Sequence, residues 1–85
     1  MNSFKELFDS VKNYCLENNK IPAIGIKTWI DPLTPVSFDG STAVFSVITE
    51  FQKNIVMSTY ADIIKEAFFT LLGLNIEIII NVESN

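Results

Sequence analysis

Apolar and polar positions follow a helical period in the first third of this chain. Over residues 4–16 apolar side chains recur every three or four positions, which predicts a helix with one buried face. A shorter second helix is expected to begin at Pro22, because proline suits the first turn of a helix. Pro32 disfavours helical geometry at the residue before it, so this second helix should end near Ile30.

The period changes to that of strands in the middle of the chain. Residues 34–38 and 42–48 are rich in Val, Phe and Thr, and Asp39-Gly40 between them is a hairpin signal. Pro35 cannot donate a ladder hydrogen bond. The first of these two strands should therefore lie at a sheet edge or begin after Pro35.

A long third helix and a last strand complete the pattern. Thr49 and Gln52 have the spacing of a capping box, and Gly73 is placed to cap the other end of an apolar helical repeat. Residues 76–82 alternate so that the even positions should face the core. The order α-α-β-β-α-β predicts an α+β fold in which three helices pack on a small three-stranded sheet. We expect one domain over residues 1–85, with its core at about residues 4–82.

Composition narrows the class of protein. The chain has 85 residues, is 48% hydrophobic, carries a formal net charge of −4 and contains no arginine. An acidic domain without arginine is a poor candidate for strong nucleic-acid binding. A single cysteine excludes an internal disulfide and fits a cytoplasmic protein. No segment is long and apolar enough to cross a membrane, and we expect no contact with one.

Few residues are equipped for chemistry. The chain has no histidine, which removes the usual general base and the commonest metal ligand. Cys15 lies on the apolar stripe of the first helix, as a buried structural thiol would. Three glycines cannot supply a phosphate-binding loop, and the scattered carboxylates form no calcium loop. We therefore expect neither an enzyme nor a protein with a cofactor or metal.

The ordered set of segments carries a family resemblance. Thr28-Trp29-Ile30-Asp31-Pro32-Leu33 precedes the hairpin, and a long helix opening with Glu50-Phe51-Gln52 and containing Tyr60 follows it. This order resembles the N-terminal domain of the bacterial replication initiator DnaA. The resemblance implies a KH-like arrangement and a module for protein–protein interaction. Its implied partners are the replicative helicase (DnaB-type) at the origin, initiator regulators and other initiator copies.

The resemblance also suggests which residues bind partners. An aromatic at the start of the third helix contacts the helicase in this family, and here it is Phe51. The family adds an acidic residue four positions before the tryptophan. Gly25 occupies that place here and brings no charge, and we expect it to line the same surface patch as Phe51. Phe8 is the nearest match to an aromatic used for self-association, with Phe4 or Leu7 as alternatives. For Phe51 and Phe8, an ordinary role in the hydrophobic core is an equally open alternative. Trp29 is expected in the core because it shares a helical face with Ile26 and Ile30.

Two alternative functions remain. One is a KH-like module that binds single-stranded nucleic acid weakly, using Lys27, Lys53 and Lys20 if they converge. A KH domain needs a GXXG loop, which is missing here. The other is a stand-alone protein that mimics the initiator domain and titrates its partners.

Overall fold

The computed structural model describes residues 3–83. Its first helix, α1, runs Ser3–Glu17, one residue longer at each end than predicted. The second helix begins as α2, Ala23–Gly25, after Pro22, and continues as η1, Ile26–Ile30, a stretch of wider π-helical turns. It ends at the residue that Pro32 predicts.

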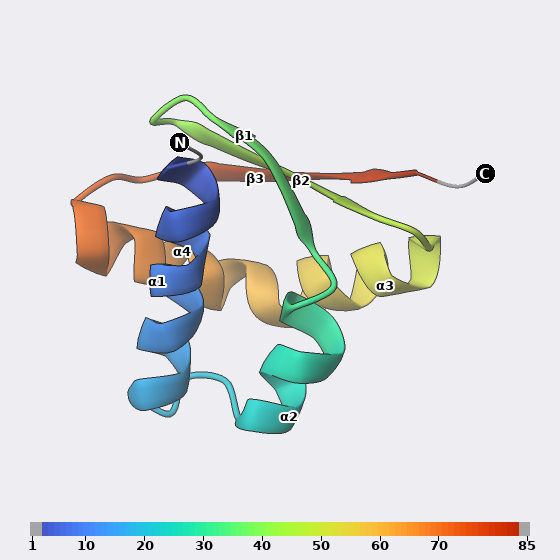
Figure 1. Cartoon of the computed structure of the whole chain (residues 1–85), viewed down its shortest axis with the longest axis horizontal. Coiled ribbons are helices and arrows are strands. Elements are labelled where there is room, and N and C mark those ends of the chain that lie inside the picture. Colours follow the sequence, from blue (N-terminus) through green and yellow to red (C-terminus); the bar gives the residue numbers. More distant parts are fainter. Residues whose placement is uncertain (1–2, 84–85) are drawn as a thin grey trace.

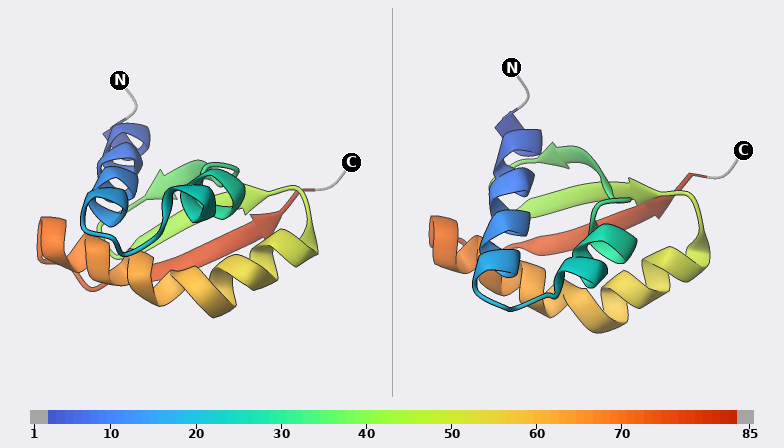
Figure 2. Two further views of the ribbon diagram at one scale, coloured as in Figure 1. Left: turned by 90° about the horizontal axis from the view of Figure 1, so that it is seen from below. Right: turned by 60° about the horizontal axis from the view of Figure 1, so that its bottom comes forward.

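The third helix is long and is built from three consecutive segments (Figure 1). They are α3, Glu50–Ile55; η2, Val56–Tyr60; and α4, Ala61–Leu72. The middle segment is again π-helical, and such bulges bend helices. Tyr60, at the end of the bulge, has φ −114° and ψ −16°, and the ribbon curves along its length in Figure 2.

Both predicted caps of the third helix are confirmed. The Thr49 side chain accepts a hydrogen bond from the backbone N–H of Gln52 at 3.1 Å, which satisfies one of the free N–H groups of the first turn. Gly73 adopts the left-handed conformation, with φ 71°, and its N–H donates to the Phe69 carbonyl at 2.7 Å. The two ends of the helix are therefore set by local chemistry.

The three strands form one mixed sheet in the order β1-β2-β3. β1, Thr34–Phe38, pairs antiparallel with β2, Thr42–Val47, and β3, Glu77–Val82, pairs parallel with β2. A parallel pair needs a crossover connection, which the third helix supplies. β3 alternates as predicted, with its even positions toward the helices.

The hairpin between β1 and β2 explains the positions of Pro35 and Asp39. β1 is an edge strand, and the register slips between Pro35 and Ser37, so that Val36 is a bulged residue. At the turn, the Asp39 carboxylate accepts hydrogen bonds from the backbone N–H groups of Ser41 and Thr42 and from the Ser41 hydroxyl. These bonds lower the pKa of Asp39 and hold the turn in place.

All the helices cover the same face of the sheet, and the opposite face is bare (Figures 1 and 2). The core lies between these two layers. Its largest fully buried side chains are Phe8, Phe45, Phe68, Ile21, Ile30 and Ile64. The predicted α+β architecture is confirmed, whereas its likeness to KH domains stays a prediction. None of the helices described between Ser3 and Glu83 has the length and hydropathy of a membrane span.

Candidate partner-binding surface

An exposed aromatic ring lies where β2 turns into the third helix. Phe51 is in the first turn of α3 and is 66% exposed, as a residue two positions after an N-cap can be. Its ring meets Trp29 of η1 edge to face, with the centroids 5.8 Å apart. Ile48, just before the cap, is 73% exposed. We call Trp29, Ile48 and Phe51 the corner surface.

Trp29 lies at the margin of the core. Ile26 and Ile30, on the predicted apolar face of the second helix, are buried as expected. Trp29 is only partly buried and packs against the core from its edge. One part of the indole therefore touches the interior, and another supports Phe51.

Gly25 lies four positions before Trp29 in the sequence, but it is not part of an exposed surface. It is buried, and a Cβ at this position would lie 3.0 Å from Ile21 Cγ2 and 3.1 Å from the Tyr60 hydroxyl oxygen. The expectation that Gly25 shares a surface patch with Phe51 is wrong. The missing side chain lets the second helix approach the third at Tyr60, which is a packing role.

Phe8 is also a core residue. Its side chain is 1% exposed, and its ring lies 4.8 Å from that of Phe45 on β2. A self-association contact through Phe8 would need an exposed ring, so this expectation is corrected. The Lys12 ammonium lies 5.0 Å from the ring centroid and covers its outer side.

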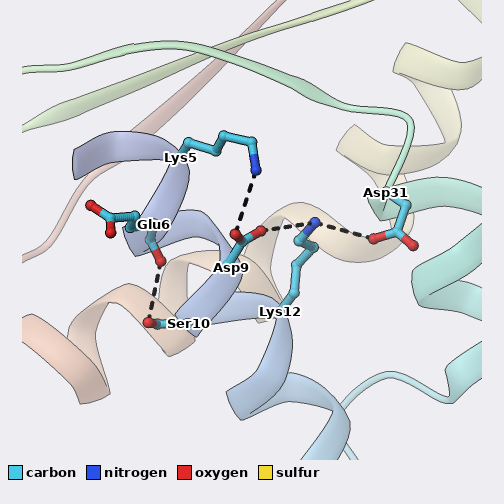
Figure 3. Close-up of polar contacts among 6 residues, drawn as sticks. All are labelled: Lys5, Glu6, Asp9, Ser10, Lys12 and Asp31. Atoms are coloured by element: carbon cyan, nitrogen blue, oxygen red, sulfur yellow. Dashed lines mark hydrogen bonds and ion pairs between the residues drawn. The ribbon is translucent and has the colours of Figure 1, made fainter. Parts of the chain in front are cut away.

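Lys12 also ties α1 to the helix that carries Trp29 (Figure 3). Its Nζ lies 3.2 Å from an Asp31 carboxylate oxygen and 3.4 Å from one of Asp9, and Lys5 lies 3.7 Å from Asp9. The Ser10 hydroxyl donates to the Glu6 carbonyl on the same helix. Exposed pairs of this kind stabilise by at most about 1 kcal/mol each. Their main effect is to hold α1 close to the end of η1, because Asp31 is the residue directly after that segment.

Lys20, one of the three lysines considered for a nucleic-acid groove, is held at another helix. Lys20 pairs with Glu66 of α4 at 3.4 Å, which draws it toward that helix. Lys27 is exposed on η1, and Lys53 is on α3. A groove that follows a nucleic-acid backbone needs several cations along one path, and the Lys20 position does not favour one.

Chemistry beyond surface contact has little support in the described part of the chain. Burial and the nearby Glu66 carboxylate raise the pKa of the Cys15 thiol, which favours the unreactive protonated form. Within residues 3–83 no pocket is found, and no three Cys, Asp or Glu side chains lie together as a metal site would require. The corner surface is therefore the best candidate site.

A second exposed apolar group was not foreseen from the sequence. Phe69, Leu72 and Leu74, at the end of α4 and just after it, are each more than a third exposed. The apolar repeat of the helix continues through this end, so periodicity alone did not distinguish it from the core. Which part of the helix stays uncovered depends on tertiary packing, which the sequence pattern does not show.

Residues 3–83 form a small α+β domain in which no pocket is found, and the corner surface is its best candidate for contact with a partner. The model of the DnaA N-terminal domain family matches residues 5–70, and the chain belongs to this family. The chain is similar to the chromosomal replication initiator protein DnaA of Bacteroides fragilis (strain YCH46), with 24% identity over 72 residues. This match covers 82% of the chain and 15% of that relative, so the chain spans only a small part of the relative's length.

Proposed function

We propose that this domain is a protein–protein interaction module in the initiation of chromosome replication and that its corner surface binds the replicative helicase. Family membership supports the general role. The proposed binding of the helicase is supported by the ring of Phe51, which is 66% exposed and packs on one side against Trp29. An aromatic at this corner is the helicase contact that the family resemblance implies.

The geometry of the corner suits a binding anchor. Aromatic residues are frequent among the few interface residues that contribute most of the binding free energy. A ring that is already packed against a neighbour loses little conformational freedom on binding, which preserves affinity. The Thr49 cap fixes where α3 begins, so the backbone under Phe51 is held as well.

The same proposal covers the remaining partners only in general terms. Initiator regulators and other initiator copies are proposed partners, but no residue is assigned to them, since Phe8 is buried. We propose that the domain works without catalysis or a cofactor. Single-stranded DNA binding is expected to be weak and sensitive to salt at a net charge of −4 without arginine.

An NMR titration tests the proposed surface. The isotopically labelled domain is titrated with the replicative helicase of the same organism. We expect the largest changes at residues 48–53 and at the Trp29 indole, with little change at Phe69 on the far end of the third helix. Changes centred on Phe69 and Leu72 instead would reject the corner surface as the helicase site.

A further inference from the structure

The sheet layer of this domain carries most of its net charge. The hairpin, residues 34–48, and the last strand, residues 77–83, together contain three of the ten carboxylates and none of the six lysines. They therefore carry −3 of the net charge of −4. The rest of the chain sets the six lysines against seven carboxylates and is close to neutral. A partner that approaches the sheet thus meets a negative field that the helices do not offset within the same layer.

Two glutamates bring this charge onto the face of the sheet that no helix of residues 3–83 covers. Side chains alternate along β3 with the even positions toward the helices, so Glu77 and Glu83 lie on the bare side. The Glu83 N–H donates to the Val47 carbonyl at 2.7 Å, which continues the strand one residue past β3. Lys65 approaches Glu77 only to 3.9 Å, and the Glu77 side chain stays 79% exposed. Both glutamates are therefore accessible.

An apolar pair lies on the same face between these glutamates. Val44 of β2 and Ile79 of β3 are direct partners in the parallel register. Ile79 is 46% exposed, and Val44 is half-buried, whereas its neighbours Ala43 and Phe45 point toward the helices and are buried. Sheets of parallel strands are almost always covered on both faces. The described helices cover only one face of the β2–β3 pair (Figure 2), so this apolar pair lacks a covering layer.

The charge of the bare face decides which class of partner fits. The positions around the apolar pair are neutral in charge: Thr34, Ser37, Thr42, Ser46 and Asn81. Phosphate groups of a nucleic acid or an anionic membrane would meet Glu77 and Glu83, and the sheet segments hold no lysine to offset the repulsion. A second copy that docked symmetrically through this face would bring the same glutamates. Charge therefore favours a basic segment of another protein.

We propose that the bare face of the sheet binds an amphipathic helix of a partner protein, with apolar side chains over Val44 and Ile79 and a lysine or arginine toward each of Glu77 and Glu83. Helices are the elements that cover both faces of the sheet in layered α/β domains. The two glutamates are six strand positions apart, or about 20 Å. A helix of about 13 residues spans this distance, so its basic residues stand three to four turns apart. None of these sheet residues belongs to the corner surface, so the two partners occupy separate sites.

An NMR titration with a model helix tests this proposal. The probe is a capped peptide of about 14 residues, with leucine and alanine in a helical repeat and lysines at both ends. We expect the largest shift changes at Val44, Ile79 and Asn81. A matched peptide with glutamate in place of lysine should bind at least about tenfold more weakly. Equal binding of the two peptides, no binding of either, or changes centred on Phe51 or Phe69 would contradict the proposal.

Charge-matched variants separate the face from the overall charge. Glu77→Gln with Glu83→Gln should weaken binding of the lysine peptide at least about fivefold. Glu6→Gln with Asp62→Asn removes the same charge from exposed positions on the helices and should leave the affinity within about twofold. Equal weakening by the two double variants would overturn the proposal.

A variant at the centre of the face tests the apolar contact. Ile79→Thr keeps a β-branched residue in the strand, so the domain should stay folded by circular dichroism and bind the lysine peptide at least about threefold more weakly. A folded Ile79→Thr variant with the parent's affinity would contradict the proposed contact. Shift changes at Val44 and Ile79 that grow with protein concentration, without peptide, would assign the face to a second copy and overturn the proposal.

Discussion

The indole of Trp29 and the ring of Phe51 meet at an interplanar angle of 63°, which joins the second helix to the first turn of the third. Edge-to-face pairs at this separation are favourable by about 0.5–1.5 kcal/mol beyond the area they bury. The contact leaves most of the Phe51 ring in solvent. Trp29 therefore orients an exposed ring as well as packing against the core.

The first prediction concerns the coupling between these two rings. Trp29→Ala should lower the free energy of unfolding by about 2 kcal/mol, less than the roughly 3–5 kcal/mol typical of a fully buried aromatic, because Trp29 is only partly buried. Phe51→Ala should cost less, about 1 kcal/mol. A double-mutant cycle measured by urea unfolding with circular dichroism should give a coupling of about 0.5–1.5 kcal/mol. A coupling near zero would mean that the rings are neighbours without mutual stabilisation.

The second prediction concerns Gly25. Alanine normally stabilises a helix by up to about 1 kcal/mol relative to glycine, but here its Cβ would press on Ile21 and Tyr60. Overpacking a core costs about 1–3 kcal/mol. Gly25→Ala should therefore destabilise the domain by about 1 kcal/mol in urea unfolding.

Tyr60→Phe supplies the control for this prediction. It removes the hydroxyl that lies 3.1 Å from the added Cβ, so Gly25→Ala should cost less in that background. If Gly25→Ala stabilises the domain in both backgrounds, the close approach of the two helices is not limiting.

The third prediction concerns pH. The hydrogen bonds from Ser41 and Thr42 favour the charged form of Asp39 and lower its pKa in the folded state. A lowered folded pKa means that this stabilisation is present above the ordinary aspartate value of about 3.9 and is lost as the pH falls through the folded pKa. An NMR titration of the Asp39 carboxyl should give a pKa below that ordinary value.

Ser41→Ala tests the cause of the shift. It removes the hydroxyl donor and leaves the two backbone donors, so the pKa of Asp39 should rise part of the way toward its ordinary value. An unchanged pKa in this variant would show that the backbone bonds alone are responsible, and an ordinary pKa in the parent would contradict the turn geometry.

Local signals in the sequence were sufficient to predict most of the helices and strands and where they end. The caps at Thr49 and Gly73, the edge position of Pro35 and the end of the second helix near Ile30 each depend on one residue and its neighbours along the chain. The π-helical segments could not be predicted in this way. One begins directly after Gly25 and the other ends at Tyr60, where the second and third helices approach closely, so both coincide with a tertiary contact that a local pattern does not show.

The candidate site was harder to predict than the fold. Phe8 and Phe51 are both aromatic residues on helices, and one is buried while the other is largely exposed. The difference arises because α1 lies over the sheet, beside Phe45, whereas the first turn of α3 projects past the end of β2. Sequence spacing locates a residue on its helix, but it does not show where the sheet below that helix ends.

The most direct test of the proposed function compares two exposed phenylalanines of the third helix. Phe51→Ala and Phe69→Ala each remove a ring that is more than half exposed, and both should leave the domain folded by circular dichroism. In calorimetric titrations with the replicative helicase, Phe51→Ala should weaken binding at least about tenfold, or about 1.4 kcal/mol, and Phe69→Ala should bind like the parent. A folded Phe51→Ala variant with the parent's affinity would contradict the assignment of the corner surface to the helicase.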